Sequence, residues 1–198
     1  MTDIKGPAVD PEAFRVEGHC CGIRLPVLKE LTGEGIRFEF SPEMKAELLA
    51  AGTRMPAWVD AGVRDYAERL RGDYRLELVE VELGRRATGD ARRAIEAEGE
   101  RMLAAAGPRA ALVAAQVGGR ALSTEQLARW LEERARLGEP LAFCIGGPDG
   151  LAPAVDQRAC LRWSLSALTL PHGLARVVVA EALYRAVSVI KGLPYHRP

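Results

Sequence analysis

The chain has 198 residues, of which 48% are hydrophobic and 27% charged, a composition typical of a globular protein with a core of ordinary size. Its 27 basic and 27 acidic residues cancel, which argues against non-specific nucleic-acid binding. No apolar run approaches the roughly 18 residues that a membrane span needs, and from the N-terminal residues we expect neither a secretory signal nor a transit peptide. We therefore expect a cytoplasmic protein with no membrane partner.

Residues 1–43 differ from the remainder in composition. They contain four prolines, several glycines and little periodicity, apart from the strand-like alternation of Ile36–Phe40. Five basic and eight acidic residues lie there, which leaves 22 basic and 19 acidic residues, a mild positive excess, in 44–198. We expect 1–43 to be an N-terminal extension, either poorly ordered or the product of a misassigned start, ahead of one domain over 44–198.

The four cysteines do not form a recognisable framework. Cys20 and Cys21 are adjacent, whereas Cys144 and Cys160 lie far away, so the spacing fits neither a disulfide scaffold nor a paired zinc motif. His19 precedes the first pair, but no second pair of ligands accompanies it. We expect reduced thiols and no metal site.

From Met44 onward, strand and helix patterns alternate. The predicted elements are a strand over 45–52, a helix from Pro56 to about Leu70, a strand over Tyr74–Leu83, a helix from about Asp90 to Ala106, a strand over Ala110–Gln116, a helix capped by Ser123 and Gln126, a strand over 140–147, a short helix over Ala152–Cys160 and a helix from about Leu174 to Ile190. This order is typical of an α/β fold with a largely parallel sheet. Ligands bind such sheets beyond the carboxyl ends of the strands, so the loops of interest follow Gln116 and Ile145 and include Leu165–Leu170.

The glycine-rich segment Ile145–Gly150 (IGGPDG) is the first candidate for ligand contact. It has neither the GxGxxG fingerprint of dinucleotide binding nor the terminal Lys-Ser/Thr of a P-loop. A tight turn after a strand is the simpler interpretation, and the functional one is that Gly146 lets a ligand approach the backbone. Ser164 and Ser166 lie near His172 in the sequence, which by itself is no catalytic triad.

The segment Arg162–Gly173 (RWSLSALTLPHG) is unusual because nine uncharged residues follow Arg162, three of them with hydroxyls. A phosphate-bearing ligand would need cations or a helix N-terminus, and the neighbouring loops offer only Arg120. S-adenosylmethionine has no phosphate, and its cationic sulfonium suits carbonyls and hydroxyls. The segment is compatible with that cofactor, and a core strand followed by a loop fits it nearly as well.

Six stretches of the chain point to a known family. The segments GTRMPAWV, EGERMLAAAG, IGGPDGL, WSLSALTLPH, RVVVAEALYRA and the terminal PYHR closely resemble the ribosomal RNA large-subunit methyltransferase H family, which belongs to the SPOUT methyltransferases. They occur in the family's order and spacing from about Met44 to the C-terminus. The resemblance does not extend to residues 1–43.

The resemblance implies a homodimer of α/β subunits, each with a SPOUT-type, mostly parallel sheet flanked by helices and a C-terminal trefoil knot. It also implies S-adenosylmethionine as cofactor and methylation of N3 of a pseudouridine in 23S ribosomal RNA, on assembled ribosomes. Carried over by position, the cofactor contacts fall on Ala115, Gly146, Leu165, Ser166, Ala167, Leu168, Thr169 and Leu170. The family has a TLD- or TLE-like motif where this chain has Ala114–Gln116, so packing on the adenosine is expected to differ.

The resemblance places the catalytic residues near the C-terminus. Tyr195 is expected to contact the target base, and His196 is the candidate general base, because an imidazole ordinarily titrates near neutrality. Arg185 and Arg176 match family arginines and are candidates for RNA phosphate contacts or for the subunit interface. An ordinary surface pair of Glu181 with Arg185 is the simpler interpretation of that arginine.

Three further features are interpreted structurally. His172 is expected to shape the knotted loop, and Trp163 to lie in the core or the interface. The helix from about Leu174 to Ile190 has a broad apolar face that suits core packing and a dimer interface. Two alternatives to the methyltransferase remain: a non-catalytic ribosome-associated binding protein with the same fold, and an enzyme that methylates a different RNA.

Overall fold

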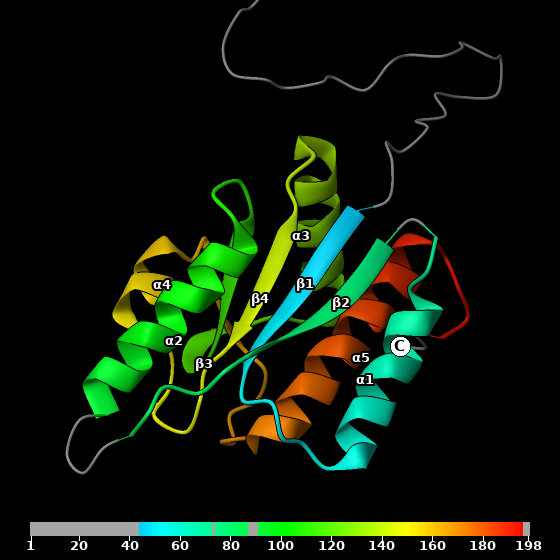
Figure 1. Cartoon of the computed structure of the whole chain (residues 1–198). Coiled ribbons are helices and arrows are strands. Elements are labelled where there is room, and N and C mark those ends of the chain that lie inside the picture. Colours follow the sequence, from blue (N-terminus) through cyan, green and yellow to red (C-terminus); the bar gives the residue numbers. More distant parts are fainter. Residues whose placement is uncertain (1–43, 73, 87–90, 196–198) are drawn as a thin grey trace, which may run out of the picture.

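The computed structural model describes residues 44–72, 74–86 and 91–195, in which strands and helices alternate (Figure 1). Their bounds are β1 Met44–Ala51, α1 Ala57–Arg69, β2 Tyr74–Val81, α2 Ala91–Ala106, β3 Ala111–Ala121, α3 Thr124–Leu137, β4 Leu141–Ile145, α4 Pro153–Arg158, β5 Leu161–Ser164 and α5 His172–Ile190. The alternation predicted from the sequence is confirmed. The expectations for residues 1–43 and for His196 lie outside the described residues. No helix in the described ranges is long and apolar enough to cross a membrane.

The described strands form one five-stranded sheet in the order β2-β1-β4-β3-β5, and every neighbouring pair is parallel. β1 lies between β2 and β4, so that Leu48 is opposite Leu78 on one side and Phe143 on the other. The prediction of an α/β fold with a parallel sheet is therefore confirmed. β2 is an edge strand, which accounts for its alternation of apolar and charged residues.

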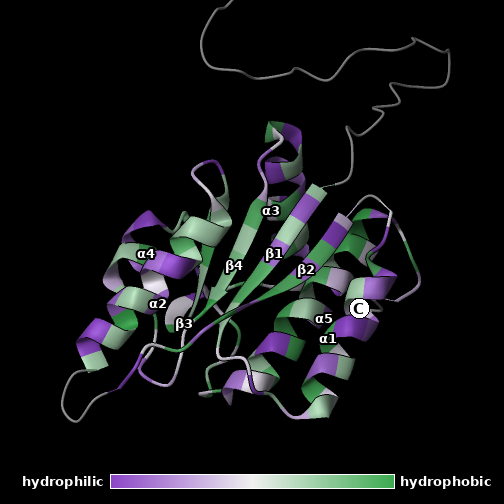
Figure 2. Cartoon of the chain, in the orientation of Figure 1, coloured by the Kyte–Doolittle hydropathy of each residue, from purple (hydrophilic) through white to green (hydrophobic). Residues whose placement is uncertain are grey.

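Helices cover both faces of the sheet and divide the core into two layers. Along β1, Leu48 and Ala50 pack with α1, α3 and α5, whereas Leu49 and Ala51 point the other way, toward α2 and α4. Figure 2 shows apolar residues along the central strands and polar residues on the outer sides of most helices. Each fully buried leucine contributes about 1.5–3 kcal/mol, so this double-sided burial is the main source of stability.

Helix α3 has the capping box that the sequence predicted. The Ser123 hydroxyl accepts a hydrogen bond from the backbone N–H of Gln126 at 3.2 Å, and the Gln126 side chain accepts one from the Ser123 backbone at 2.9 Å. At the other end Gly138 has a φ of 64°, a left-handed conformation that glycine adopts without strain. Both ends of the helix are thus determined locally.

The interpretation of Arg162–Gly173 as a core strand followed by a loop is the one that the structure has, with β5 at Leu161–Ser164, whereas the predicted bounds made β3 too short. Trp163 of β5 pairs with both Ala115 and Arg120 of β3, so the four residues between them bulge out of the ladder. A Cβ on Gly119 would lie 2.8 Å from the backbone of Arg162, which explains a glycine at this close approach. The predicted strand ended at Gln116, whereas β3 continues to Ala121. Trp163 is 4% exposed and packs in the core, as expected.

Candidate functional site

The carboxyl ends of β4 and β5 lie at one edge of the sheet, beside the part of β3 where its pairing with β4 ends. Ala115 of β3 lies opposite Trp163 of β5, one position beyond the last pair between β3 and β4. Gly146 follows directly after β4, and the loop Leu165–Leu170 follows directly after β5. The structure therefore brings together the predicted contact residues of all three strands, at the edge where parallel sheets bind ligands.

The loop after β4 is a tight turn. The backbone N–H of Gly150 donates to the carbonyl of Gly147 at 3.0 Å, and Gly150 has a φ of 91°. A Cβ on Gly146 would lie 2.4 Å from the backbone of Gly150, so no other residue fits there without a shift. The turn itself requires this glycine, as the simpler interpretation of the sequence held.

The loop Leu165–Leu170 is shaped by its own hydroxyl groups. The Ser164 hydroxyl lies 3.0 Å from the carbonyl of Val117 and 3.0 Å from that of Ser166. The Ser166 hydroxyl accepts a hydrogen bond from the backbone N–H of Leu168 at 3.0 Å. The serine side chains therefore hold the loop's conformation, while Thr169 is exposed.

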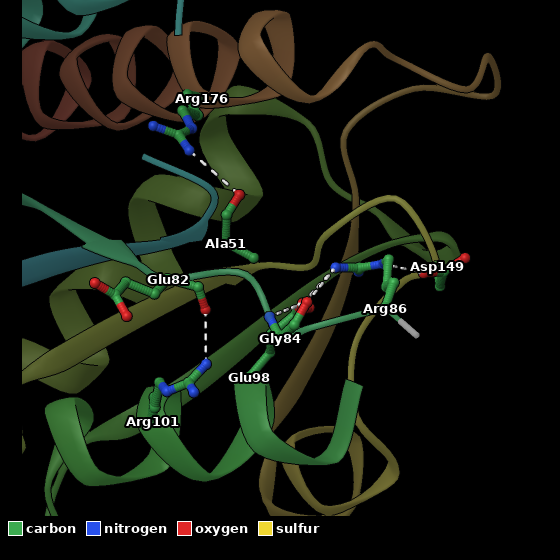
Figure 3. Close-up of polar contacts among 8 residues, drawn as sticks. All are labelled: Ala51, Glu82, Gly84, Arg86, Glu98, Arg101, Asp149 and Arg176. Atoms are coloured by element: carbon green, nitrogen blue, oxygen red, sulfur yellow. Dashed lines mark hydrogen bonds and ion pairs between the residues drawn. The ribbon is translucent and has the colours of Figure 1, made fainter. Parts of the chain in front are cut away.

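Helix α5 begins immediately after this loop and is anchored by a buried arginine. Arg176 has no exposed surface, and its Nη1 donates to Glu80 Oε1 at 2.8 Å. Its Nη2 donates to the carbonyl of Gly52 and to that of Ala51, the second of which is drawn in Figure 3. The expectation that Arg176 contacts RNA phosphate or a subunit interface is wrong, because its side chain is buried and its donors bind groups of the same subunit. The signal for burial was its position on the apolar face of the helix.

His172, the first residue of α5, contacts the same arginine. Arg176 Nε donates to His172 Nε2 at 3.2 Å, which requires that nitrogen to be unprotonated. Burial and then the charge of Arg176 lower the pKa of His172 below its ordinary value. His172 thus supports the start of the helix, in agreement with a structural role beside the loop.

Comparisons with known proteins agree on one family. The family model described as "Predicted SPOUT methyltransferase" matches residues 44–196. The ribosomal RNA large subunit methyltransferase H of Alkalilimnicola ehrlichii is 52% identical over 155 residues, 78% of this chain and 99% of the relative. The proteins of the same name from Stenotrophomonas maltophilia and Pseudomonas fluorescens are 52% and 48% identical over 155 residues, again 78% of this chain, and 99% and 100% of those relatives.

The chain belongs to the SPOUT methyltransferase family. Membership implies a methyl donor of the S-adenosylmethionine type. The residues at the sheet edge fit such a donor, because the exposed part of the loop, from Ala167 to Thr169, carries no charge that would repel a sulfonium. The turn at Gly146 likewise offers backbone groups rather than a side chain.

A second cluster of predicted site residues forms where Tyr195 packs against the later turns of α5. Tyr195 Oη donates to Glu181 Oε1 at 3.2 Å, and the Tyr195 ring lies 4.6 Å from that of Tyr184, centroid to centroid. Glu181 also pairs with Arg185, so the surface pair expected from the sequence is confirmed. Partial burial and hydrogen bonds with Tyr66 and Glu181 raise the pKa of the Tyr195 phenol, which keeps it protonated.

This second cluster is not adjacent to the loop within one subunit. Glu181 lies nine positions after His172, about 14 Å along the helix axis. Within one subunit, α5 therefore separates Tyr195 and Arg185 from the loop Leu165–Leu170.

The departure from the family motif at Ala114–Gln116 has a local explanation. The Gln116 amide donates to Asp156 Oδ1 at 2.7 Å, and Arg162 Nε donates to the same oxygen at 2.6 Å. The hydrogen bond from Arg162 and then the one from Gln116 lower the pKa of Asp156. Gln116 therefore ties β3 to α4 and β5, while Ala115 is half-buried against the core.

Within the described residues, little supports a cysteine nucleophile or a metal site. Burial raises the pKa of the Cys144 thiol to about 12, so it is not a nucleophile. No group of three or more His, Cys, Asp or Glu side chains converges in the ranges that the structure describes. A hollow of about 600 Å³ lies beside the beginning of β2, at the amino end of the sheet and away from the loops above. It is lined by Arg64, Ala67, Glu68, Arg71, Arg75, Leu76 and Glu77.

Proposed function

We propose that the chain is an S-adenosylmethionine-dependent methyltransferase that modifies N3 of a pseudouridine in 23S ribosomal RNA within assembled ribosomes. The observation that carries the proposal is about 50% identity to relatives named ribosomal RNA large subunit methyltransferase H, over 99–100% of their length. The zero net charge of the chain supports an assembled particle over naked RNA, because no strong general attraction to phosphate is built in. A ribosomal substrate also agrees with the expected cytoplasmic location.

The proposed cofactor site is the carboxyl edge of the sheet. Ala115, Gly146 and the loop Leu165–Leu170 would hold the cofactor largely through backbone groups, since the Ser166 hydroxyl is already bonded within the loop. The bound cofactor supplies an electrophilic methyl group on sulfur. In the trefoil knot expected of the family, this loop would be wrapped by the chain around it.

The residues of the chain have two tasks in this reaction. One is to hold the target base in line with the methyl donor, a positioning effect worth roughly 7–11 kcal/mol in favourable cases. The other is to remove the N3 proton, for which His196 is the proposed general base. Tyr195 would stack on or hydrogen-bond to the base, and Arg185 would contact the RNA nearby.

A homodimer would join these two clusters. Tyr195 contacts α5 about two and a half helical turns from its start, so the loop and the terminal residues of one copy stay apart. Trp58, Leu168 and Leu174 are 56%, 73% and 37% exposed, which is apolar surface that a second copy would cover. In a two-fold arrangement the terminus of each copy would reach the loop of the other.

The proposal is tested by methyl transfer from labelled S-adenosylmethionine to purified 70S ribosomes that lack the modification. We expect one methyl group on a pseudouridine of the large-subunit RNA, located by mass spectrometry. A strain deleted for this chain should lose the modification. A retained methyl group would overturn the assignment, and binding of ribosomes without binding of the cofactor would favour the non-catalytic alternative.

A further inference from the structure

Helix α2 carries a carboxylate that is buried beside the candidate cofactor site. Glu98 is 2% exposed. Its Oε1 accepts a hydrogen bond from the backbone N–H of Gly84 at 2.8 Å and forms an ion pair with Arg86 Nη1 at 3.0 Å. Its Oε2 has no hydrogen-bond partner in the described structure. A buried charge is costly unless it is paired, so this carboxylate calls for an explanation beyond ordinary packing.

The partner of Glu98 reaches across to the loop that follows β4. Arg86 Nε donates to Asp149 Oδ2 at 2.8 Å, while its Nη1 also donates to the carbonyl of Gly84 at 3.2 Å (Figure 3). Asp149 stands inside the tight turn Gly147–Gly150. One guanidinium therefore links the buried carboxylate of α2 to the turn that follows Gly146.

The side chains of Glu98 and Arg86 also lie close to the backbone of the turn at Gly147. A Cβ built on Gly147 would lie 2.9 Å from Glu98 Oε2 and 3.2 Å from Arg86 Nη2. The turn is thus held at two points, by close contact at Gly147 and by an ion pair at Asp149. Moving the turn toward α2 would bring it against the carboxylate, and moving it away would break the ion pair.

Two glycines fix the helix from which this clamp acts. A Cβ on Gly84 would lie 2.5 Å from the backbone of Ala94, and one on Gly99 would lie 2.3 Å from the Cβ of Ala152. Helix α2 therefore packs closely on the end of β2 and on the start of α4. Glu98 is placed between these contacts and has little freedom to follow a moving loop.

We propose that Glu98 and Arg86 are positioning residues that hold the loop 146–150 in the conformation that receives the methyl donor. The inference rests on the proposed function and adds Arg86, in the segment after β2, and Glu98 of α2, neither of which sequence reasoning singled out. Three of the five loop residues are glycines, which are flexible unless they are tied. A loop that is ordered before binding loses less entropy on binding, so the clamp should appear as cofactor affinity.

The experiment compares the full-length protein with Glu98→Gln, Asp149→Asn, Arg86→Gln and Arg86→Lys. Arg101→Gln is the matched control, because Arg101 Nη1 also joins α2 to the segment after β2, through the carbonyl of Glu82 at 2.8 Å (Figure 3). Affinity for S-adenosylmethionine is measured by calorimetry, melting temperature by circular dichroism, and kcat and KM by methyl transfer to ribosomes.

We expect Glu98→Gln, Asp149→Asn and Arg86→Gln to bind S-adenosylmethionine about tenfold to a hundredfold more weakly, as for the loss of a charged hydrogen bond. KM for the cofactor should rise correspondingly, with kcat at saturation within about threefold of wild type, because the clamp touches no reacting atom. Arg86→Lys should recover part of the loss, since a lysine keeps the charge opposite Asp149.

Two outcomes would overturn the inference and one would remove its basis. If Asp149→Asn, at a partly exposed residue that folding tolerates, binds as tightly as wild type, the clamp has no role in binding. If affinity falls only together with melting temperature, and equally in Arg101→Gln, the cluster is merely structural. If wild type itself does not bind S-adenosylmethionine, the proposed function is wrong, and the inference that rests on it is wrong as well.

Discussion

Arg176 Nη1 lies 2.8 Å from Glu80 Oε1, which joins the first turns of α5 to the edge strand β2 across 96 residues of sequence. The arginine has no exposed surface, whereas the Glu80 side chain is 32% exposed. The guanidinium also donates to the carbonyls of Ala51 and Gly52, at the end of β1. One side chain therefore holds together α5, β2 and the end of β1.

Replacing Arg176 with methionine should lower the free energy of unfolding by about 2–4 kcal/mol. The loss comes from the Ala51 and Gly52 carbonyls, which are buried and would lose their donor. Glu80 is partly exposed and can regain water, which keeps the loss below the upper range for buried pairs. Urea unfolding followed by circular dichroism measures the change.

The matched control for that substitution is Arg129→Met on the exposed face of α3. Surface changes of this kind usually alter stability by no more than about 0.5 kcal/mol. Equal losses in Arg176→Met and Arg129→Met would contradict the role assigned to the buried arginine. Arg176→Lys should fall between the two, because an ammonium cannot reproduce the fork of donors.

The stability of the protein should decrease as the pH falls below neutrality, with His172 responsible for part of the decrease. Burial and the charge of Arg176 depress the pKa of His172 from its ordinary 6.5 in the folded state, so the unfolded chain takes up a proton first. The contribution of the neutral imidazole is fully present above about pH 6.5. It is lost as the pH falls from there through the lower folded pKa.

Urea unfolding of wild type and His172→Gln between pH 8 and pH 5.5 tests this dependence. The variant should show a flatter curve over that window, because its residue 172 does not titrate. His19 and His196 are present in both proteins, so their titration cancels in the comparison. Parallel curves for the two proteins would show that His172 does not carry the effect.

Gly146→Ala should weaken cofactor binding and reduce stability by about 1–3 kcal/mol, as for other overpacked sites. The added Cβ would lie 2.4 Å from the backbone of Gly150 and would force the turn open. Gly118→Ala is the control, since a Cβ there has no heavy atom within 4 Å. The measurements are calorimetry with S-adenosylmethionine and urea unfolding, and equal behaviour of the two variants would contradict the assigned constraint at Gly146.

Much of the fold was predictable because its signals are local. The capping box at Ser123, the alternation of β2 and the apolar run of β4 each require only neighbouring residues to be read. The strand β5 was only one of two interpretations of its segment, since its pairing with β3 depends on a bulge that only the tertiary structure defines. Its four residues carry no periodicity long enough to mark a strand.

The candidate site was predictable in part, and the buried charges were not. Parallel strands bring Ala115, Gly146 and Leu165–Leu170 to one edge, which follows from element order alone. The roles of Arg176 and Glu98 depend on partners far away in the sequence, and a single chain without its fold gives no sign of those pairs. The trefoil knot is an expectation from the family resemblance alone, because periodicity carries no signal of a knot.

A chain that begins at Met44 should fold and methylate ribosomes as well as the full chain does. The family model matches from residue 44 onward, and the relatives align over 155 residues, which is the length of 44–198. Melting temperature and methyl transfer are compared between the two lengths. A drop of many degrees or a large loss of activity would show that residues 1–43 belong to the working protein.

His196→Ala should slow methyl transfer about 10²- to 10⁴-fold while leaving the affinity for S-adenosylmethionine unchanged, as expected for a general base that does not touch the cofactor. Tyr195→Phe keeps the ring that packs on Tyr184 and removes only the hydroxyl that contacts Glu181, so it should retain most activity if the ring stacks on the target base. Tyr195→Ala should lose that activity.

Single-turnover transfer on ribosomes, with calorimetry for the cofactor, separates the roles of these two terminal residues. If His196→Ala loses cofactor binding instead, the residue belongs to the cofactor site and the base must be sought elsewhere. If Tyr195→Phe is as slow as Tyr195→Ala, the phenolic hydroxyl rather than the ring contacts the substrate.

Mixed dimers test whether each terminus serves the loop of its partner. They contain one wild-type copy and one copy with both Tyr195→Ala and His196→Ala, purified by two different tags. Transfer at about half the wild-type rate is expected, because one complete site would remain in each mixed dimer whether the terminus acts in its own copy or in the other. A further Gly146→Ala substitution, placed in the wild-type copy, therefore distinguishes the two arrangements. It should leave the activity unchanged if that copy's terminus serves the partner's loop, and should lower the activity further if each terminus serves its own.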